Sequence, residues 1–167
     1  MPLRAVNDTI QVSDALTQLA TVMIANTALQ AAGGPTFVND ATGLYEADVI
    51  WPALLLEEDQ VIEVRPGIRT WKKSALAVCT YMDCYAQKNQ TIDTAWNLVD
   101  LDVRRMVANI EDSPTISVGG IVYIERIVRV TFSPYGEKVV DHETFSVPVV
   151  QRQIVVEFEL PAYVSAY

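Results

Sequence analysis

The sequence predicts an α+β fold, a two-layer sandwich in which two helices pack on one face of a mainly antiparallel sheet. Ile92–Ile110 has helical periodicity, an uncharged helical stretch precedes it, and several later segments alternate with the period of a strand. The order is helix, strands, helix, strands, and a layer of helices on one sheet face accommodates it. With 167 residues, half of them hydrophobic, the chain is expected to form a single domain, 1–167.

The chain begins with an expected extended arm, residues 1–11, which contains Pro2 and few packing signals. Ser13 or Asp14 then begins the first helix, and the glycine pair before Pro35 ends it. This helix carries no charge from Ala15 to Ala32, so we expect it to be covered on more than one side. Its predicted core stripe consists of Leu16, Leu19, Ala20, Met23, Thr27 and Ala31.

Two short strands are predicted next, at Trp51–Leu56 and Val61–Arg65. Between them lie three consecutive acidic residues, Glu57, Glu58 and Asp59. These carboxylates suit a charged, solvated hairpin tip.

A longer strand is predicted over residues 68–85, where side chains alternate well. One face carries Leu76, Val78, Thr80 and Met82, and the other carries Ala75, Ala77, Cys79 and Tyr81. Both faces are mostly apolar, so this strand belongs inside the sheet or under helices.

The main helix follows at Ile92–Ile110, with Thr91 or Asp93 as its N-cap and a stop at Ser113-Pro114. A stripe about 120° wide faces the core. The stripe consists of Ile92, Ala95, Trp96, Val99, Val103, Met106, Val107 and Ile110. Asp100 and Arg104 flank it at the favourable i, i+4 spacing.

Two leucines on this helix depart from the pattern. Leu101 points away from the apolar stripe, and Leu98 lies on the same outer side, where Arg105 also lies. Monomers tolerate partly exposed leucines, which is one interpretation. The other is that a second subunit covers Leu98, Leu101 and Arg105, and these three residues are the predicted subunit interface.

Thr115–Phe132 is predicted as strand, broken at Gly119-Gly120, where glycines permit a bulge or the close approach of another backbone. Residues 133–148 are rich in polar and turn-forming residues and are expected to form a long loop. Ile154–Leu160 has the clearest strand alternation in the chain, and residues 161–167 are expected to be a short C-terminal tail.

Charge argues against nucleic-acid recognition. The chain has 12 basic and 21 acidic residues, a formal net charge of −9, and its basic residues form no cluster. Such a balance repels duplex DNA. Cys79 and Cys84 have neither redox nor zinc spacing, which favours two free thiols in a reducing compartment. Without an evident secretory signal or membrane span, we expect a soluble protein made in a cytoplasm.

The residues that carry chemistry predict no enzyme, no cofactor and no metal site. His142 is the single histidine, and its acidic neighbours Asp141 and Glu143 are adjacent to it in sequence, so the three seldom point to one centre. The acidic run Glu57–Asp59 suits a hairpin better than acid–base catalysis. No phosphate loop, zinc-protease motif or nucleophile elbow is present.

The order of these segments resembles the tail-terminator, or tail-completion, proteins of long-tailed bacteriophages. The resemblance covers roughly residues 50–160. It rests on the Trp51–Leu56 strand with its Pro-Ala pair, the strand to Tyr85, the Ile92–Ile110 helix, Gly119-Gly120 and the closing strand with its acidic-aromatic Val155–Glu159. The segments 36–50 and 133–150 are longer than in the family pattern.

The resemblance implies a structural virion protein in the tail or neck that forms a hexameric ring at the head-proximal end of the tail. Such a ring terminates tail-tube polymerisation and joins the tail to neck or connector proteins. DNA passes through its lumen without specific binding, and acidic walls suit that passage. On this resemblance, Glu57, Glu58 and Asp59 are candidates to face the lumen, as an alternative to the solvated hairpin tip. The open alternatives are a related neck or head-closure ring or a tail-tube protein, and a small dimeric regulatory or ligand-binding α+β domain.

Overall fold

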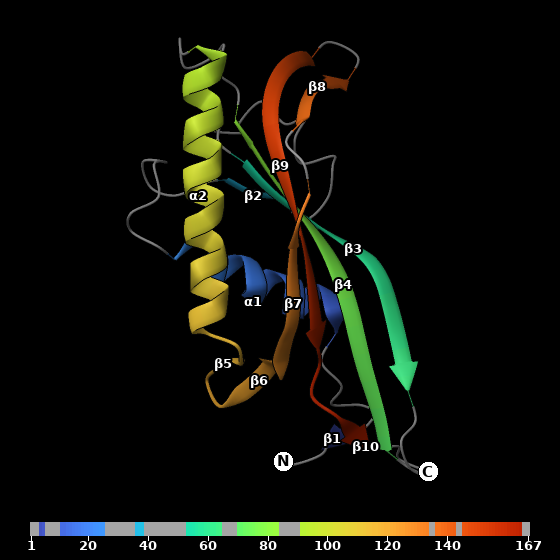
Figure 1. Ribbon diagram of the computed structural model, residues 1–167. Coiled ribbons are helices and arrows are strands. Elements are labelled where there is room, and N and C mark those ends of the chain that lie inside the picture. The colour runs from blue at the N-terminus through green and yellow to red at the C-terminus, as the bar shows by residue number, and fades with distance from the viewer. Residues whose placement is uncertain are drawn as a thin grey trace.

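The computed structural model describes residues 4–5, 11–25, 36–38, 53–64, 70–83, 91–133, 136–142 and 145–164. It confirms the α+β prediction (Figure 1). The helices are α1 (Val12–Ile24) and α2 (Ile92–Asp112). The strands are β1 (Arg4–Ala5), β2 (Thr36–Val38), β3 (Ala53–Val64), β4 (Thr70–Asp83), β5 (Ile116–Val118), β6 (Ile121–Ile124), β7 (Arg126–Phe132), β8 (Gly136–His142), β9 (Phe145–Glu159) and β10 (Tyr163–Val164).

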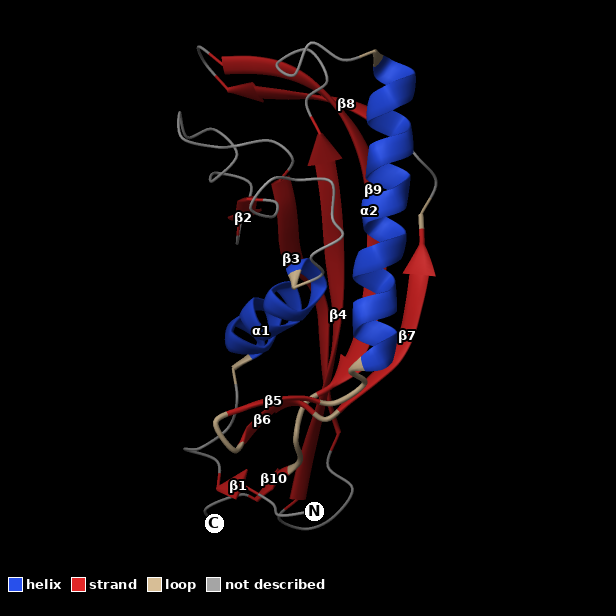
Figure 2. Cartoon of the chain, turned by 90° about the vertical axis from the view of Figure 1, so that its left-hand side faces the viewer, coloured by secondary structure: helices blue, strands red, loops and turns tan. Residues whose placement is uncertain are grey.

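The body of the main sheet is the run β3-β4-β9-β7, in which each neighbouring pair is antiparallel. Strand β8 also pairs with β9 in antiparallel fashion, while β2 runs parallel to β3. Both helices pack against the sheet, and Figure 2 shows α2 lying along its strands while α1 crosses it. A separate two-stranded hairpin, β5-β6, lies below α1 in the same view.

The two faces of β4 are those that the alternation predicts. Ala75, Ala77, Cys79 and Tyr81 are all buried in the core that the helices cover. Their partners on β9 include Phe158 and Ile154, which are fully buried, as the pattern of Ile154–Leu160 predicts. Small residues on β4 therefore leave room for large ones on β9 beneath the helices.

Strand β3 corrects the prediction of two short strands with a hairpin tip between them. It runs without interruption from Ala53 to Val64, paired with β4 throughout. The acidic run falls in mid-strand, where a β-bulge shifts the register between Glu58 and Gln60. A bulge accommodates an extra residue without ending the strand, and the sequence interpretation took this charged irregularity for a turn.

Helix α2 follows the prediction closely. Thr91 is its N-cap, and the Thr91 hydroxyl oxygen accepts a hydrogen bond from the Thr94 amide at 3.3 Å. The predicted stripe is buried from Ala95 to Ile110, with Ile92 and Trp96 partly buried against the core. One further residue shares the buried face, and it is an acid, Asp102.

Helix α1 begins at Val12, slightly before the predicted start, and Gln11 caps it without a side-chain hydrogen bond. Its predicted continuation over residues 26–32 lies outside the described residues. The Asn109 amide nitrogen on α2 donates to the Val22 and Met23 carbonyl oxygens at 3.0 and 3.2 Å. The Ala25 amide also donates to the Val22 carbonyl at 3.3 Å, so Asn109 adds a second donor at a helix end where carbonyls have few partners. Contacts with β3, β5 and β6 cover other sides of α1.

The glycine pair makes a tight turn. Gly119 and Gly120 have φ of 59° and 79° and join β5 to β6. Two positive φ values in a two-residue connection are typical of the turns that favour glycine. A Cβ added at either glycine would meet nothing within 4 Å. Of the alternatives that a glycine pair permits, the described chain therefore shows no close approach of another backbone, and the pair instead forms the turn.

Strand β7 contains a second bulge, between Ile127 and Arg129. The bulge changes which residues share a face, because Ile127 now lies opposite Phe158 and Val130 opposite Val156, both on the helix side. In a regular strand, Ile127 and Val130 would point to different faces, because they are three residues apart. A single inserted residue reverses the pattern on one side of it.

The expected loop over 133–148 is largely a β-hairpin, formed by β8 and the first half of β9. Residues Phe145–Val149 of β9 pair with β8 and with no other described strand. Pro148 and the polar residues nearby favoured a loop, but proline is compatible with a strand that has one partner.

The expected arm and tail also contain short strands. Within them, β1 pairs in parallel with β10, and β10 pairs with β4. Figure 1 shows β1 and β10 together at the lower end of the sheet. The two ends of the chain are thus joined to the main sheet at these residues.

Candidate functional site

The predicted subunit interface lies on the outer side of α2. Leu101 is 39% exposed, Leu98 is partly exposed, and the Arg105 side chain is 28% exposed. A guanidinium nitrogen of Arg105 lies 4.0 Å from a carboxylate oxygen of Asp102. The structure therefore leaves an apolar side chain in solvent at the centre of this helix face, as the sequence pattern predicts.

Replacing Leu101 with aspartate should weaken self-association and leave the fold intact, because the side chain already lies in solvent in the isolated chain. Light scattering over a concentration series measures the association, and circular dichroism checks the helix content. Unchanged assembly of a folded Leu101→Asp variant would remove this residue from the interface.

The three acidic residues predicted to face a lumen do not form one surface. Glu57 and Glu58 are both exposed, but they pair with Val78 and Ala77, which lie on opposite faces of β4. Consecutive strand residues point to opposite faces. The side chain of Asp59 lies outside the described residues.

A buried polar pair that the sequence interpretation missed joins α2 to the sheet. The Tyr81 hydroxyl donates to an Asp102 carboxylate oxygen at 2.6 Å, and both residues are about 1% exposed. Burial, the hydrogen bond to Asp102 and the negative charges of Asp102 and Asp83 raise the pKa of Tyr81. The phenol therefore keeps its proton and acts as a donor. Asp102 lies three residues after Val99 and four before Met106, so its helical position indicates burial although its residue type does not.

An ion-pair network lies beside this pair. Arg152 on β9 contacts Asp100 on α2 at 2.7 Å, and Arg104 contacts the other Asp100 oxygen at 3.0 Å, as its spacing predicts. The Arg152 guanidinium also lies 4.6 Å from the centre of the Phe132 ring. A guanidinium on an aromatic face is favourable. These contacts link α2, β9 and β7.

The buried pair and its neighbours are suited to positioning a helix. Asp102 and Tyr81 are enclosed in the core, so a substrate has no access to them in the described structure. Among the described residues, no group of three histidine, cysteine, aspartate or glutamate side chains is placed to hold a metal ion. His142 ends β8, and its side chain is outside the described set.

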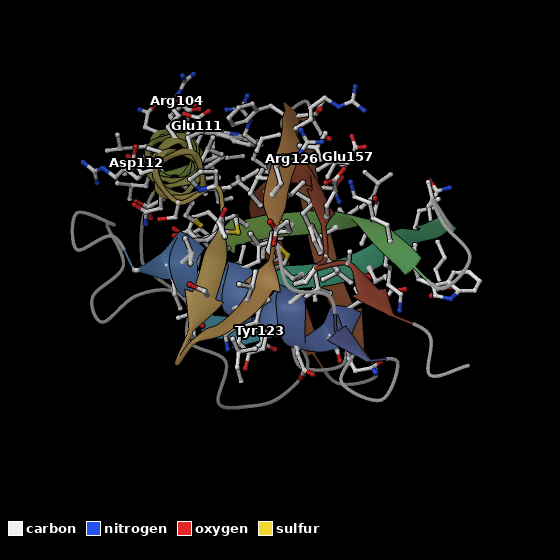
Figure 3. The ribbon with its side chains drawn as sticks, turned by 90° about the horizontal axis from the view of Figure 1, so that it is seen from below. Arg104, Glu111, Asp112, Tyr123, Arg126 and Glu157 are labelled. Atoms are coloured by element: carbon white, nitrogen blue, oxygen red, sulfur yellow. The ribbon has the colours of Figure 1, made fainter. Side chains whose placement is uncertain are left out.

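The sheet face opposite the helices carries charged pairs across strands. Glu159 on β9 contacts Lys72 on β4 and Arg126 on β7, each at 3.1 Å, and Glu157 contacts Arg129 at 3.1 Å. Partial burial raises the pKa of Glu159, but hydrogen bonds from Arg126 and Lys72 outweigh that effect and leave the pKa below its ordinary value. Figure 3 shows Arg126 and Glu157 away from α2, whose outer side carries Arg104.

Two concave surfaces adjoin this charged face. A groove of about 320 Å³ runs between the end of α2 and β7, lined by residues that include Ile110, Glu111 and Val128. A smaller hollow of about 90 Å³ lies over β3 and β4 near Ile62 and Ser74. Neither combines an enclosed apolar interior with convergent polar groups, which is the usual form of a small-molecule site.

Cys79 is fully buried in the core, and burial raises the pKa of its thiol from an ordinary 9.0 to about 12. The folded state therefore holds the thiol proton more tightly than the unfolded state. The contribution of the protonated thiol to the free energy of unfolding is complete below pH 9 and is lost as the pH rises toward 12. A thiol in this state is a poor nucleophile at neutral pH.

We expect the free energy of unfolding to fall more steeply above pH 9 in the natural chain than in a Cys79→Ala variant. The difference in slope should approach about 1.4 kcal/mol per pH unit, the value for one proton. Urea titrations at several pH values between 9 and 11 measure both slopes. Tyr81 also lowers the free energy of unfolding at high pH, but it does so in both proteins and cancels in the comparison. Equal slopes would therefore contradict the role of the Cys79 thiol.

Within the described part of the chain, no helix is long and apolar enough to cross a membrane. No family model matches the sequence, and a search of curated proteins finds no match.

Proposed function

We propose that this chain is a structural subunit, without catalytic activity, of a ring at the head-proximal end of a bacteriophage tail. In this role it stops the growth of the tail tube and joins the tail to the neck. The partners are other copies of the chain, the tube protein and the neck or connector proteins. The site of action is the virion, after synthesis in the host cytoplasm.

The observation that carries the proposal is the β8-β9 hairpin. Phe145–Val149 continue β9 past the end of β4 at Asp83, with β8 as their described partner. Five strand residues span roughly 17 Å, and Figure 1 shows the hairpin curving away from the sheet. A two-stranded hairpin is marginal in water unless it packs against something else. A contact with an axial partner, such as the end of a tube, would supply that packing.

Other features agree with a subunit of an assembly. Leu101 is exposed on α2. The sheet face opposite the helices carries cross-strand ion pairs, and the run β3-β4-β9-β7 ends in two strands, β3 and β7, with exposed side chains. The net charge of −9 favours the passage of DNA without retention if acidic walls line a channel. Each feature supports contact with protein partners more directly than binding of a small molecule.

The test is the mass of the purified protein in solution, followed by imaging with tail tubes of the same phage. We expect rings of about six 18.5 kDa chains that attach to one tube end and stop elongation. Rings that stack into tubes would favour the tube-protein alternative, and rings that bind only connectors would favour a neck ring. A compact dimer indifferent to tubes would refute the proposal and favour a small regulatory domain.

A matched variant separates the hairpin from the rest of the chain. Replacing residues 139–148 with a two-residue Asn-Gly turn joins the paired residues Lys138 and Val149 and shortens the hairpin where β9 pairs with β8. We expect this variant to keep its fold and its self-association but to lose attachment to tubes. Normal termination by the shortened chain would show that the hairpin is not the axial contact.

A further inference from the structure

The run β3-β4-β9-β7 ends in two strands that each have one long exposed edge. Beyond Leu55, where its pairing with β2 ends, β3 pairs only with β4 in the described structure. At the other side, β7 pairs only with β9 among the described strands. An exposed edge is a template for pairing with another chain.

The two edges differ in charge. On β3, Glu57, Glu58 and Glu63 are exposed, and the Glu63 side chain is 48% exposed although it pairs with Lys73 at 3.4 Å. On β7, the side chains of Arg126 and Arg129 are 61% and 70% exposed despite their ion pairs with β9. An acidic edge on one side and a basic edge on the other are complementary between copies and repulsive between identical edges.

The strand directions suit the same pairing. Neighbours alternate in direction across the run, so β7 of one copy and β3 of a copy placed beside it in the same orientation are antiparallel. The ladder of pairings places Arg126 level with Ile62, through Glu159 and Ser74. An adjacent copy without displacement along the strands therefore brings Arg126 beside Ile62 and Arg129 beside Gln60, on the face opposite the helices. Glu57 of that copy lies on the same face, level with Thr131 and thus diagonal to Arg129.

Exposed apolar side chains accompany both edges. Ile62 is 47% exposed on β3, while Val128 and Phe132 are 41% and 39% exposed on β7. Val128 also lines the groove between β7 and α2. The Ile127 amide already donates to the Pro114 carbonyl at 3.0 Å, so the accessible part of the β7 edge begins at Val128.

We infer that the β7 edge, Val128–Phe132 with Arg126 and Arg129, binds the β3 edge, Leu56–Val64, of a second copy of this chain. The contact is antiparallel and head-to-tail, so successive copies close into a ring or continue as a filament. This inference rests on the ring of the proposed function and names its subunit contact. It assigns Glu57 and Glu58 to that contact and away from a lumen.

Charge reversal tests the pairing. The first variant, Arg126→Glu/Arg129→Glu, makes both edges acidic. The second, Glu57→Lys/Glu58→Lys, makes both edges basic and includes Glu57, the glutamate on the same face as the two arginines. We expect each variant alone to need at least tenfold more protein to assemble, measured by light scattering. An equimolar mixture should assemble again, because the natural β3 edge of the first variant pairs with the natural β7 edge of the second, and the two reversed edges are again opposite in charge.

Controls separate an interface effect from misfolding. Asp112→Lys reverses a charge on the end of α2, where Figure 3 shows Asp112 directed away from β7, and it should assemble like the natural chain. If a reversal variant unfolds by circular dichroism, the neutral pair Arg126→Gln/Arg129→Gln replaces it with the same expected direction.

A natural chain that stays monomeric at high concentration would overturn the inference. It would equally be overturned by folded single-edge variants that assemble normally, or by a mixture that fails to recover. If assembly depends on the charges of the two edges but the assemblies leave tube growth unaffected, the proposed tail function would be refuted and the proposed edge pairing would stand. The two proposals thus fail in distinguishable ways.

Discussion

Replacing Phe158 with alanine should lower the free energy of unfolding by about 3–5 kcal/mol, the usual cost of removing a large buried aromatic side chain. Phe158 is fully buried on β9. It lies between Ala75 on β4 and Ile127 on β7 in the sheet register. The alanines of β4 are too small to fill the space that the ring vacates, so a cavity should remain under the helices.

The measurement is urea denaturation of the natural chain and the variant, with the slopes compared to confirm two-state unfolding. Val155→Ala is the matched control, since Val155 lies on the other face of the same strand and is only partly buried. Its cost should be about 1 kcal/mol or less. Similar losses for the two variants would mean that the helix-covered face does not hold the main core.

Replacing Tyr81 with phenylalanine should cost about 1.5–3 kcal/mol, the range for a hydrogen bond to a charged group. The substitution keeps the ring in the core and removes only the donor to Asp102 at 2.6 Å. The Asp102 carboxylate then stays buried with one fewer donor, and a charge deprived of a partner in the core is costly.

A double-mutant cycle with Asp102→Leu isolates the pair. If the hydrogen bond accounts for the loss, Tyr81→Phe should cost much less in the Asp102→Leu background than in the natural one. Leucine at position 102 extends the apolar stripe of α2, so the double variant should recover stability relative to Tyr81→Phe alone. Additive losses would show that the two side chains act independently.

Periodicity was sufficient for the elements whose environment is uniform along their length. The stripe of α2, its Thr91 cap and the alternation of β4 all appear in the structure as predicted. In each, burial on one side imposes a regular spacing on the sequence, and the spacing is therefore readable. The same reasoning placed Leu101 on the exposed side of the helix.

Irregular strands were less predictable, and for a shared reason. The bulges in β3 and β7 each add one residue, and after an added residue the alternation resumes on the other face. The acidic run of β3 lacks the apolar pattern of a buried strand. In the β8-β9 hairpin, Pro148 and the polar residues before Phe145 obscured the alternation of Phe145, Val147 and Val149. A local pattern carries little information where a strand has one partner and much solvent.

The sequence by itself determined the class of the fold, the position and facing of α2, the faces of β4 and the outward position of Leu101. Only the tertiary structure decided that Asp102 meets Tyr81, that Arg152 joins Asp100, and that an acidic and a basic edge end the same run of strands. These relations join residues far apart in the chain, and they follow from strand order and register. Local periodicity is set by burial within one element, whereas partnership across elements is set by how the elements pack together.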